Sequence, residues 1–352
     1  MNYSEFKTLI NGGIEMAEKN FLMRGLDEKH LKKFKESEVG WFDFYKKYKK
    51  EIFLGIRNNY INLYYKGMNI AKIQGNFNNA RISNKYVNKN YKGKSKEISI
   101  TYDDFNKKYE NVIKPEVIKH INKNKLWEKS TQQSLILKNN QNKNSNWICI
   151  DMEYSKQRKN NNSNNGKSFG RFDIIAVNKK NFEVALIELK VGKDAIGGKS
   201  GLLKHAQDWN YAYIENDLFN QDIEGGSNSL KKEIVRIINN KIKLENDFPI
   251  KSCSIKDFKN IKPSFYFLIC SGNNLTLNEV KNEVRKYLWS EDKCKNYNIK
   301  KVSKKYNVEE NLYDITTKKD GKLYCQFLFI DGQGDNIRIS DIIDDENYDR
   351  NI

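Results

Sequence analysis

Charged residues at the ends of apolar strand patterns are the first residues here that could carry chemistry. The segment 170–192 reads as two strands joined by a polar turn. Asp173 interrupts the first apolar run, and the second run ends in Glu188-Leu189-Lys190. A carboxylate inside an apolar strand costs free energy unless a partner offsets its desolvation. The pattern leaves two interpretations: charges at solvated strand ends, or charges that share a buried metal ion.

These residue types suit the hydrolysis of a phosphodiester bond. Mg²⁺ takes oxygen ligands and keeps several waters, so Asp173 and Glu188 with a substrate phosphate would be enough to hold it. Bound Mg²⁺ polarises both a water molecule and the scissile phosphate. Side chains repeat every second residue along a strand, so Lys190 points the same way as Glu188. Its ammonium group can orient the water and neutralise developing negative charge. We therefore favour the shared metal site, with an ordinary surface hairpin as the alternative.

Two more acidic residues are candidates for the same site. Glu153 lies in the strand-like segment 147–157, two residues after Asp151, and the two are expected on one face. Glu128 lies on the preceding helical segment. A solvated carboxylate is the alternative for each. We favour Glu153 as a catalytic residue, because it follows an apolar run and should reach the working edge of the sheet.

A helical segment after the second strand supplies further polar candidates. Gln207 and Tyr211 are four residues apart and share a helix face, so they could contact substrate, or pack. Arg171 and Lys204 could contact phosphates, with ion pairing or solvation as the alternative. His205 is predicted to point elsewhere on the helix, and we do not expect histidine catalysis.

The order of Asp173, Glu188-x-Lys190 and Gln207-x-x-x-Tyr211 resembles the PD-(D/E)xK phosphodiesterase superfamily. The glutamine and tyrosine are similar to the QxxxY motif of its RecB-like members. The resemblance covers roughly residues 115 to 275 and implies a restriction-endonuclease-like core. One departure is Phe172, which stands where a proline often precedes the motif aspartate.

The resemblance implies catalytic roles for Asp173, Glu188 and Lys190. It implies Mg²⁺, for which Mn²⁺ can substitute, held by the two carboxylates and the backbone carbonyl of Leu189. Glu128 stands where the superfamily often places its first motif glutamate. The implied activity is that of a Mg²⁺-dependent endonuclease acting on DNA, in some members as a homodimer. By analogy alone it suggests restriction or antiviral defence. A nuclease that cuts RNA or needs a ligand activator, and a DNA-binding or regulatory protein without cleavage, remain alternatives.

The elements that must position these residues fall into two predicted modules. Residues 1–110 are expected to form an N-terminal α+β module, with helices up to about residue 50 and then a three-stranded meander. Tight turns are expected at Asn58-Asn59 and Lys66-Gly67. Tyrosines on the middle strand of this meander could stack nucleic-acid bases, but more often such residues close a small core.

Residues 111–352 are expected to form the nuclease-like domain. The pattern predicts a helix from Pro115 to about Asn139, and an exposed polar loop at 158–168. The remaining predicted elements are strands at 147–157, 170–178, 184–190, 264–270 and 322–330, and helices at 202–218, 230–245 and 275–289. This order predicts an α/β fold, with one mixed sheet and helices on both faces.

Composition limits the classes of partner. The 352 residues carry a formal net charge of +18, and a basic protein attracts polyanions, of which DNA is favoured and RNA is the alternative. Lys-rich composition from an AT-rich genome would also raise the charge. No signal-peptide pattern and no apolar run long enough to cross a bilayer is found, so we expect a cytoplasmic protein without a membrane partner. The 5 cysteines are scattered without CxxC spacing, which disfavours a zinc site.

Overall fold

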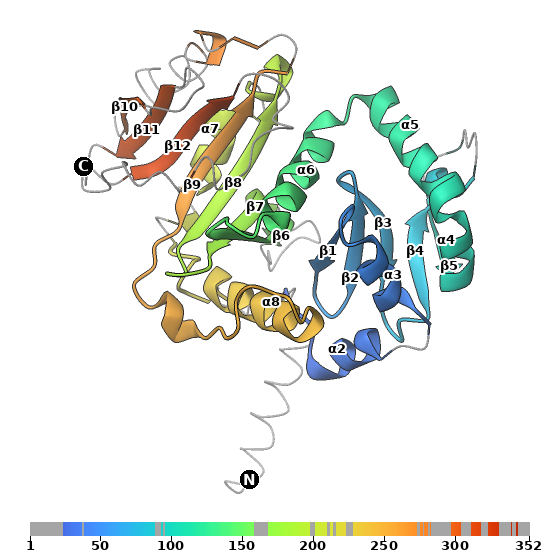
Figure 1. Ribbon diagram of the computed structural model, residues 1–352. Coiled ribbons are helices and arrows are strands. Elements are labelled where there is room, and N and C mark those ends of the chain that lie inside the picture. Colours follow the sequence, from blue (N-terminus) through green and yellow to red (C-terminus); the bar gives the residue numbers. More distant parts are fainter. Residues whose placement is uncertain are drawn as a thin grey trace, which may run out of the picture.

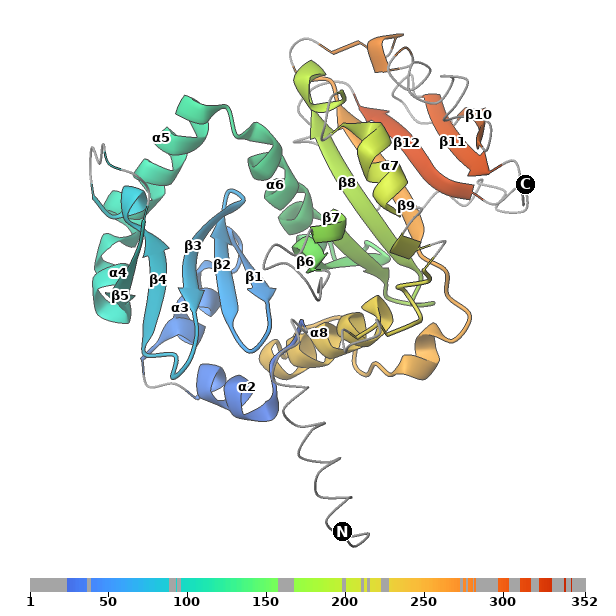
Figure 2. The same ribbon diagram turned by 180° about the vertical axis from the view of Figure 1, so that it is seen from behind.

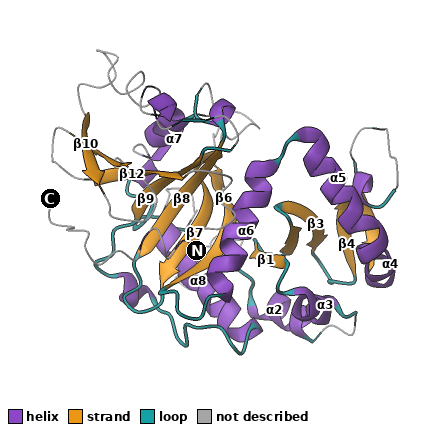
Figure 3. Cartoon of the chain, turned by 45° about the horizontal axis from the view of Figure 1, so that its top comes forward, coloured by secondary structure: helices purple, strands orange, loops and turns teal. Residues whose placement is uncertain are grey.

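The computed structural model of the chain contains two β-sheets with helix α6 between them (Figures 1 and 3). It describes residues 24–36, 39–88, 93, 96–157, 168–197, 201–209, 212–213, 216–222, 228–272, 275–276, 278–280, 282, 297–303, 311–317, 323–330, 339 and 343. No helix in this part of the chain is both long and apolar enough to cross a membrane.

The first sheet is an antiparallel meander in which each strand pairs with the next along the chain. Two short helices precede it, so the predicted helices before residue 50 are confirmed where the chain is described, and the three-stranded meander is confirmed as well. Two further strands were not predicted, because their apolar runs are short. The elements are α2 (Glu28–Lys35), α3 (Trp41–Tyr48), β1 (Ile52–Ile56), β2 (Ile61–Tyr65), β3 (Met68–Ile73), β4 (Asn79–Ser83), η1 (Asn84–Tyr86) and β5 (Glu97–Thr101).

Both predicted turns of this meander are confirmed. Asn59, Lys66 and Gly67 have φ values of 54°, 48° and 75°, the left-handed conformation that tight turns require. At Gly67 a side chain is also excluded by space, because a Cβ atom would lie 2.1 Å from a backbone oxygen of α6. Tyr64 and Tyr65 on the middle strand are buried, which supports the core-closing interpretation of these tyrosines.

A helical run connects the two sheets. It comprises α4 (Tyr102–Lys108), the π-helical turn η2 (Tyr109–Ile113), α5 (Lys114–Asn124) and α6 (Trp127–Gln141). The prediction of one continuous helix from Pro115 to Asn139 is therefore wrong. Lys125 adopts a left-handed conformation, with φ 52°, and its N–H turns back to the carbonyl of Asn122, which ends α5.

The second sheet has seven strands in the order β10-β11-β12-β9-β8-β7-β6. The neighbours β12, β9 and β8 run parallel, and the other pairs are antiparallel, so the predicted mixed sheet is confirmed. Strands β10 and β11 were not predicted. The strands are β6 (Trp147–Gln157), β7 (Ser168–Asn178), β8 (Val184–Val191), β9 (Ser264–Cys270), β10 (Tyr297–Ser303), β11 (Asn311–Thr317) and β12 (Leu323–Ile330).

Helices cover both faces of this sheet, as predicted. Leu135 and Ile136 of α6 pack on one face, against Ile174 and Ile187. Helices α7 (Leu202–Trp209) and α8 (Leu230–Leu244) pack on the other, and α7 lies in front of the sheet in Figure 2. The protein is thus of the mixed α/β class. The predicted helices 202–218 and 275–289 and the loop 158–168 extend outside the described residues.

One apolar cluster joins the two predicted modules. Phe34 of α2, Ile56 of β1 and Phe105 of α4 belong to the same buried cluster as Leu186 of β8 and Ile238 of α8. The two sheets therefore share one hydrophobic core on the side of α8. They are packed together and are not joined only by an exposed linker.

Candidate active site

The candidate site begins where strands β7 and β8 separate. Their pairing runs from Val177 and Val184 to Ile174 and Ile187, and no backbone pair follows it. Beyond this point the N–H of Leu189 donates to Asp173 Oδ2 at 2.7 Å. A carboxylate thus takes the place of the missing strand partner.

A second carboxylate accepts a hydrogen bond from the next backbone N–H along the same edge of β8. Glu128, at the start of α6, accepts a hydrogen bond from the N–H of Val191. Leu189 and Val191 are two residues apart, so both N–H groups point to the side away from β9. The carbonyl of Leu189 points to that side too, toward Asp173, where the prediction places it as a metal ligand.

Three neighbouring strands bring carboxylates into one row. Glu153 on β6 stands between the registered pairs Met152↔Ile174 and Tyr154↔Phe172, so it is opposite Asp173. Continuing the β7–β8 register places Glu188 beside Asp173 on the other side. The pocket at this place is lined by Glu153, Tyr154, Ser155, Arg171, Phe172, Asp173 and Glu188.

Glu188 and Lys190 form a buried ion pair on one face of β8, as the strand alternation predicted. Lys190 Nζ lies 2.8 Å from Glu188 Oε1, and the two residues are 5% and 4% exposed. His205 of α7 completes the group, with Nε2 at 2.9 Å from the same Oε1 and 3.4 Å from Lys190 Nζ. Buried charges are tolerated only when they are paired and hydrogen-bonded, and this carboxylate has two such partners.

Electrostatics divides the acidic groups into two kinds. Burial and then the negative charges of Glu188, Glu128 and Glu153 raise the pKa of Asp173 well above its usual range. Burial, with Glu188 and Glu153 nearby, likewise raises the pKa of Glu128. Burial alone would raise the pKa of Glu188, but the hydrogen bond from His205 and the neighbouring positive charge outweigh it and leave that pKa below its usual value.

Lys190 remains a cation despite its burial. Desolvation lowers its pKa, but the negative charges of Glu188 and Glu128 and the hydrogen bond to Glu188 more than compensate, so the pKa is raised. The site therefore combines one fixed ammonium group with four carboxyl groups, of which Asp173 and Glu128 are crowded by like charge. A bound cation would relieve this crowding.

The donor set fits a hard cation such as Mg²⁺. The groups that face the pocket are carboxylate and backbone oxygens, which Mg²⁺ prefers, and neither Cys nor a pair of histidines is among them. Within the described residues, no three Asp, Glu, His or Cys side chains form a complete metal-binding group. Mg²⁺ needs only one or two protein carboxylates beside water and phosphate, and Asp173 and Glu188 are the two that would supply them.

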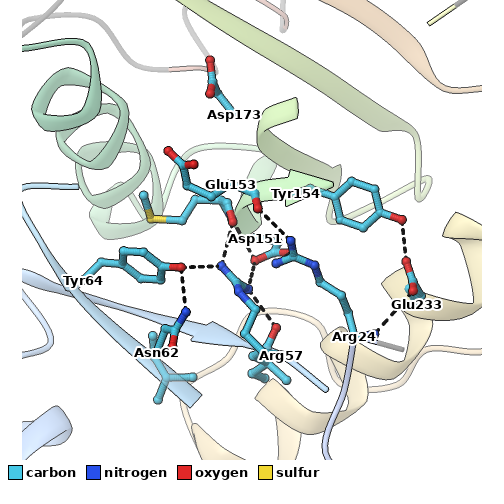
Figure 4. A network of polar contacts seen from close by, with 12 residues as sticks. Arg24, Arg57, Asn62, Tyr64, Asp151, Glu153, Tyr154, Asp173 and Glu233 are labelled. Carbon is cyan, nitrogen blue, oxygen red and sulfur yellow. Dashed lines mark hydrogen bonds and ion pairs between the residues drawn. The ribbon is translucent and has the colours of Figure 1, made fainter. Parts of the chain in front are cut away.

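Glu153 reaches the pocket by an unusual backbone conformation. Its φ is +54°, and β6 has register shifts on both sides of it. Lys129 Nζ lies 3.5 Å from its carboxylate. Asp151 was expected on the same face, but it does not line the pocket and is buried between Arg24 and Arg57 (Figure 4). The alternation fails because a left-handed residue breaks the regular extended strand.

The remaining predicted residues have mixed positions. Arg171 lines the pocket. Lys204 is exposed on α7 and pairs with Asp208 at 2.5 Å, which is the alternative considered for it. Gln207 belongs to α7, but its side chain lies outside the described part of the structure, as does Tyr211.

His205 is the site residue that the sequence interpretation missed. The helix pattern contained a signal for it, because Leu202, His205 and Trp209 have the spacing of one helix face. Leu202 and Trp209 are both buried, so this face is the one that packs on the sheet. A histidine between two core residues of α7 should have been placed toward β8.

No protein-family model, curated protein or solved structure matches this chain.

Proposed function

We propose that the protein is a Mg²⁺-dependent nuclease of the PD-(D/E)xK type that hydrolyses phosphodiester bonds of DNA. The observation that carries the proposal is the placement of Asp173, Glu188 and Lys190 at the point where β7 and β8 separate. The helix, three-stranded antiparallel unit, helix and parallel strand around them support a restriction-endonuclease-like core.

Each residue of the site would have a separate role in hydrolysis. Asp173, Glu188 and the carbonyl of Leu189 would hold the metal, which supplies Lewis-acid polarisation of water and phosphate. Lys190 would orient the attacking water and balance the charge that develops on the phosphate. Arg171 lines the pocket and would contact a phosphate oxygen.

His205 would act through Glu188 rather than on the substrate. Its ring nitrogen holds the carboxylate oxygen that also contacts Lys190. This contact fixes the direction in which the other carboxylate oxygen of Glu188 points. Groups that orient a ligand carboxylate in this way commonly change metal affinity when they are removed.

The net charge of +18 supports a polyanionic substrate, and nucleic acid is the commonest one. DNA is our first choice, and RNA is the alternative within the same activity. A role in restriction or antiviral defence, a homodimeric assembly and a requirement for an activator are finer proposals that rest on analogy.

The test compares plasmid DNA, linear duplex, single-stranded DNA and RNA, each with Mg²⁺, Mn²⁺ or EDTA. Wild type, Lys190→Ala and Lys204→Ala are assayed together, with thermal unfolding of each. We expect metal-dependent cleavage that Lys190→Ala loses by at least about 100-fold and that Lys204→Ala retains. A wild type that retards DNA on a gel but cuts none of these substrates would contradict the proposal and favour the alternative, a binding protein without cleavage.

A further inference from the structure

Two arginines from the N-terminal region reach into strand β6 beside the pocket (Figure 4). Arg24 precedes α2, and Arg57 follows β1. Arg57 Nη1 lies 2.6 Å from Asp151 Oδ1, and Arg24 Nη1 lies 2.8 Å from Asp151 Oδ2. Asp151 is fully buried and the arginines are 6% and 9% exposed. These contacts attach the first sheet to the second.

The same guanidinium groups also hold the backbone that follows Asp151. Arg57 Nη2 donates to the carbonyl of Met152 at 2.8 Å. Arg24 Nη2 donates to the carbonyl of Glu153 at 2.7 Å. Three consecutive residues of β6 are thus fixed by the two side chains. Hydrogen bonds from charged donors are short and stronger than neutral ones, and here they are shielded from solvent.

The arginines are themselves held in place. Arg57 also donates to the carbonyl of Ile56 at 2.8 Å and to the hydroxyl of Tyr64 at 3.0 Å. The guanidinium carbon of Arg24 lies 4.9 Å from the ring centre of Tyr154. The backbone N–H of Gly25 donates to the carbonyl of Arg57 at 3.1 Å, which ties the two segments together. Both side chains can therefore act as rigid supports.

The segment that they hold contains the left-handed residue Glu153. A non-glycine residue at φ +54° is disfavoured and persists only where the surroundings determine it. In a regular strand Met152 and Tyr154 would face the same side. Here Met152 packs in the cluster under α6, and Tyr154 packs in the opposite cluster, with its hydroxyl donating to Glu233 of α8 at 2.5 Å.

This reversal is what places the Glu153 carboxylate in the pocket. The residue turns the strand, so that Tyr154 enters one core while Glu153 lines the pocket with Asp173 and Glu188. Glu153 and Asp173 both line this pocket, and the pairing of β6 with β7 places them opposite each other.

We propose that Arg24, supported by Arg57, is a positioning residue that holds Glu153 in the left-handed conformation and so delivers its carboxylate to the candidate metal site. The consequence for cleavage rests on the proposed nuclease function. The conformational part does not, and it can be measured without any activity.

The conformational test compares Glu153→Gly with Glu153→Ala by thermal unfolding, in the wild-type and Arg24→Met backgrounds. At positive φ, glycine gives the more stable protein than alanine. In an extended strand, glycine gives the less stable one. We expect the glycine variant to have the higher Tm in the wild-type background, and this difference to vanish or reverse in Arg24→Met. Alanine being the more stable in the wild-type background, or an equal difference in both backgrounds, would overturn the proposal. If Arg24→Met does not fold, Arg24→Lys serves, because lysine lacks the planar fork by which the two guanidinium nitrogens contact Asp151 and the carbonyl of Glu153.

The activity test is a double-mutant cycle. Arg24→Met should reduce cleavage in the wild-type background but give less than about a twofold further loss in Glu153→Ala, because residues that act through one group are not additive. Lys241→Met is the matched control, since Lys241 is a buried cation of α8 that donates to the carbonyl of Leu54 and does not line the pocket.

The two proposals fail in different ways. A wild type that cuts nothing refutes the nuclease function and leaves the glycine–alanine comparison as the measure of the Arg24 role. A wild type that cuts, with losses from Arg24→Met and Glu153→Ala that multiply in the double variant, refutes the positioning role alone.

Discussion

Asp173 has three other carboxyl groups around it and accepts a hydrogen bond from the backbone of Leu189. Burial and the surrounding charge raise its pKa well above the usual range. Above the ordinary pKa of an aspartate, the folded, metal-free protein therefore binds more protons at this residue than the unfolded chain does. Folding is therefore linked to proton uptake at this residue, and the proposed metal binding would be linked to proton release.

The sign of this linkage gives a prediction. Because the pKa is raised on folding, the wild-type carboxyl group increasingly opposes folding as the pH rises above its ordinary value near 3.8. Asp173→Asn removes the ionisable group and should raise the Tm in EDTA, by more at pH 8 than at pH 4.5. It should also abolish the Tm increase that we expect Mg²⁺ or Mn²⁺ to give the wild type. An effect on Tm that is the same at both pH values would contradict this account.

Glu279→Gln is a control variant for which the dependence of stability on pH should have the opposite sign. Hydrogen bonds from Lys193 and Thr276 lower the pKa of Glu279 to about 2, so its contribution to folding is present at neutral pH and is lost in acid. The glutamine variant should lose stability at pH 8 and approach the wild type as the pH falls toward 2.

The sequence located some of these residues and not others, for physical reasons. Asp173, Glu188 and Lys190 stand out because charges interrupt apolar strands, and this pattern is local. The reach of Glu153 depends on a left-handed residue, which regular alternation cannot indicate. The sequence favours Glu153 over Glu128 as the companion of Asp173, whereas in the structure the negative charges of both raise the pKa of Asp173.

Helix α6 is the element that connects the two sheets to the site. Its adjacent residues Gln132 and Gln133 are both buried, but they serve different partners. Gln132 Nε2 donates to the backbone carbonyl of Asp173 at 2.5 Å. Gln133 accepts from the N–H of Gly67 at 2.6 Å and donates to the carbonyls of Glu51 and Tyr64. One residue supports the candidate site, and its neighbour holds the first sheet.

This division predicts different outcomes for two similar variants. Gln132→Ala and Gln133→Ala should each destabilise the protein by about 1–3 kcal/mol, because each leaves buried backbone groups without a partner. Only Gln132→Ala should also reduce metal affinity or cleavage, by about 10–100-fold, as expected for a group that supports a ligand residue. Mn²⁺ titration and cleavage rates, measured well below both Tm values, separate the two. Equal losses of activity would show that α6 acts only through overall stability.

At the level of elements, the helices and strands that long apolar runs mark were predicted correctly, whereas the point at which one helix ends and the next begins was not. Strands β6 to β9 and helix α8 could be predicted from apolar runs such as 264–270, for which only one secondary-structure assignment is reasonable. The end of α5 at Lys125 depends on a left-handed lysine in the polar run 122–125, where no residue type marks a boundary. Strands β4 and β5 were missed because exposed polar residues alternate along them.

At the level of the whole molecule, the predicted boundary between 1–110 and 111–352 separates the strands of the two sheets, but it does not separate two hydrophobic cores. The first sheet ends at Thr101, and a continuous helical run from Tyr102 to Asn124 crosses residue 110. One buried cluster includes residues of both sides. The pairing of Arg24 and Arg57 with Asp151 could not be read from the sequence, since nothing local marks partners so distant along the chain.

A fragment of residues 111–352 should therefore not fold on its own. It would lose the apolar surface of the first sheet and leave the fully buried Asp151 without either cation, and breaking a buried ion pair costs about 3–5 kcal/mol. Total stabilities of domains are only about 5–15 kcal/mol. Near-UV circular dichroism and thermal unfolding of the fragment, beside the full chain, provide the measurement. Cooperative unfolding near the Tm of the full chain would refute this expectation and support two independent domains.

The shared carboxylate of Asp151 also limits how this sequence can change over generations. Losing the aspartate alone would leave two guanidinium groups buried together, and losing both arginines would leave a buried anion. Positions 24, 57 and 151 should therefore vary as a set among descendants of a common ancestor, with paired replacements rather than single ones. The same descendants should accept glycine at position 153 more readily than any other substitution, wherever a carboxylate at this position is not required.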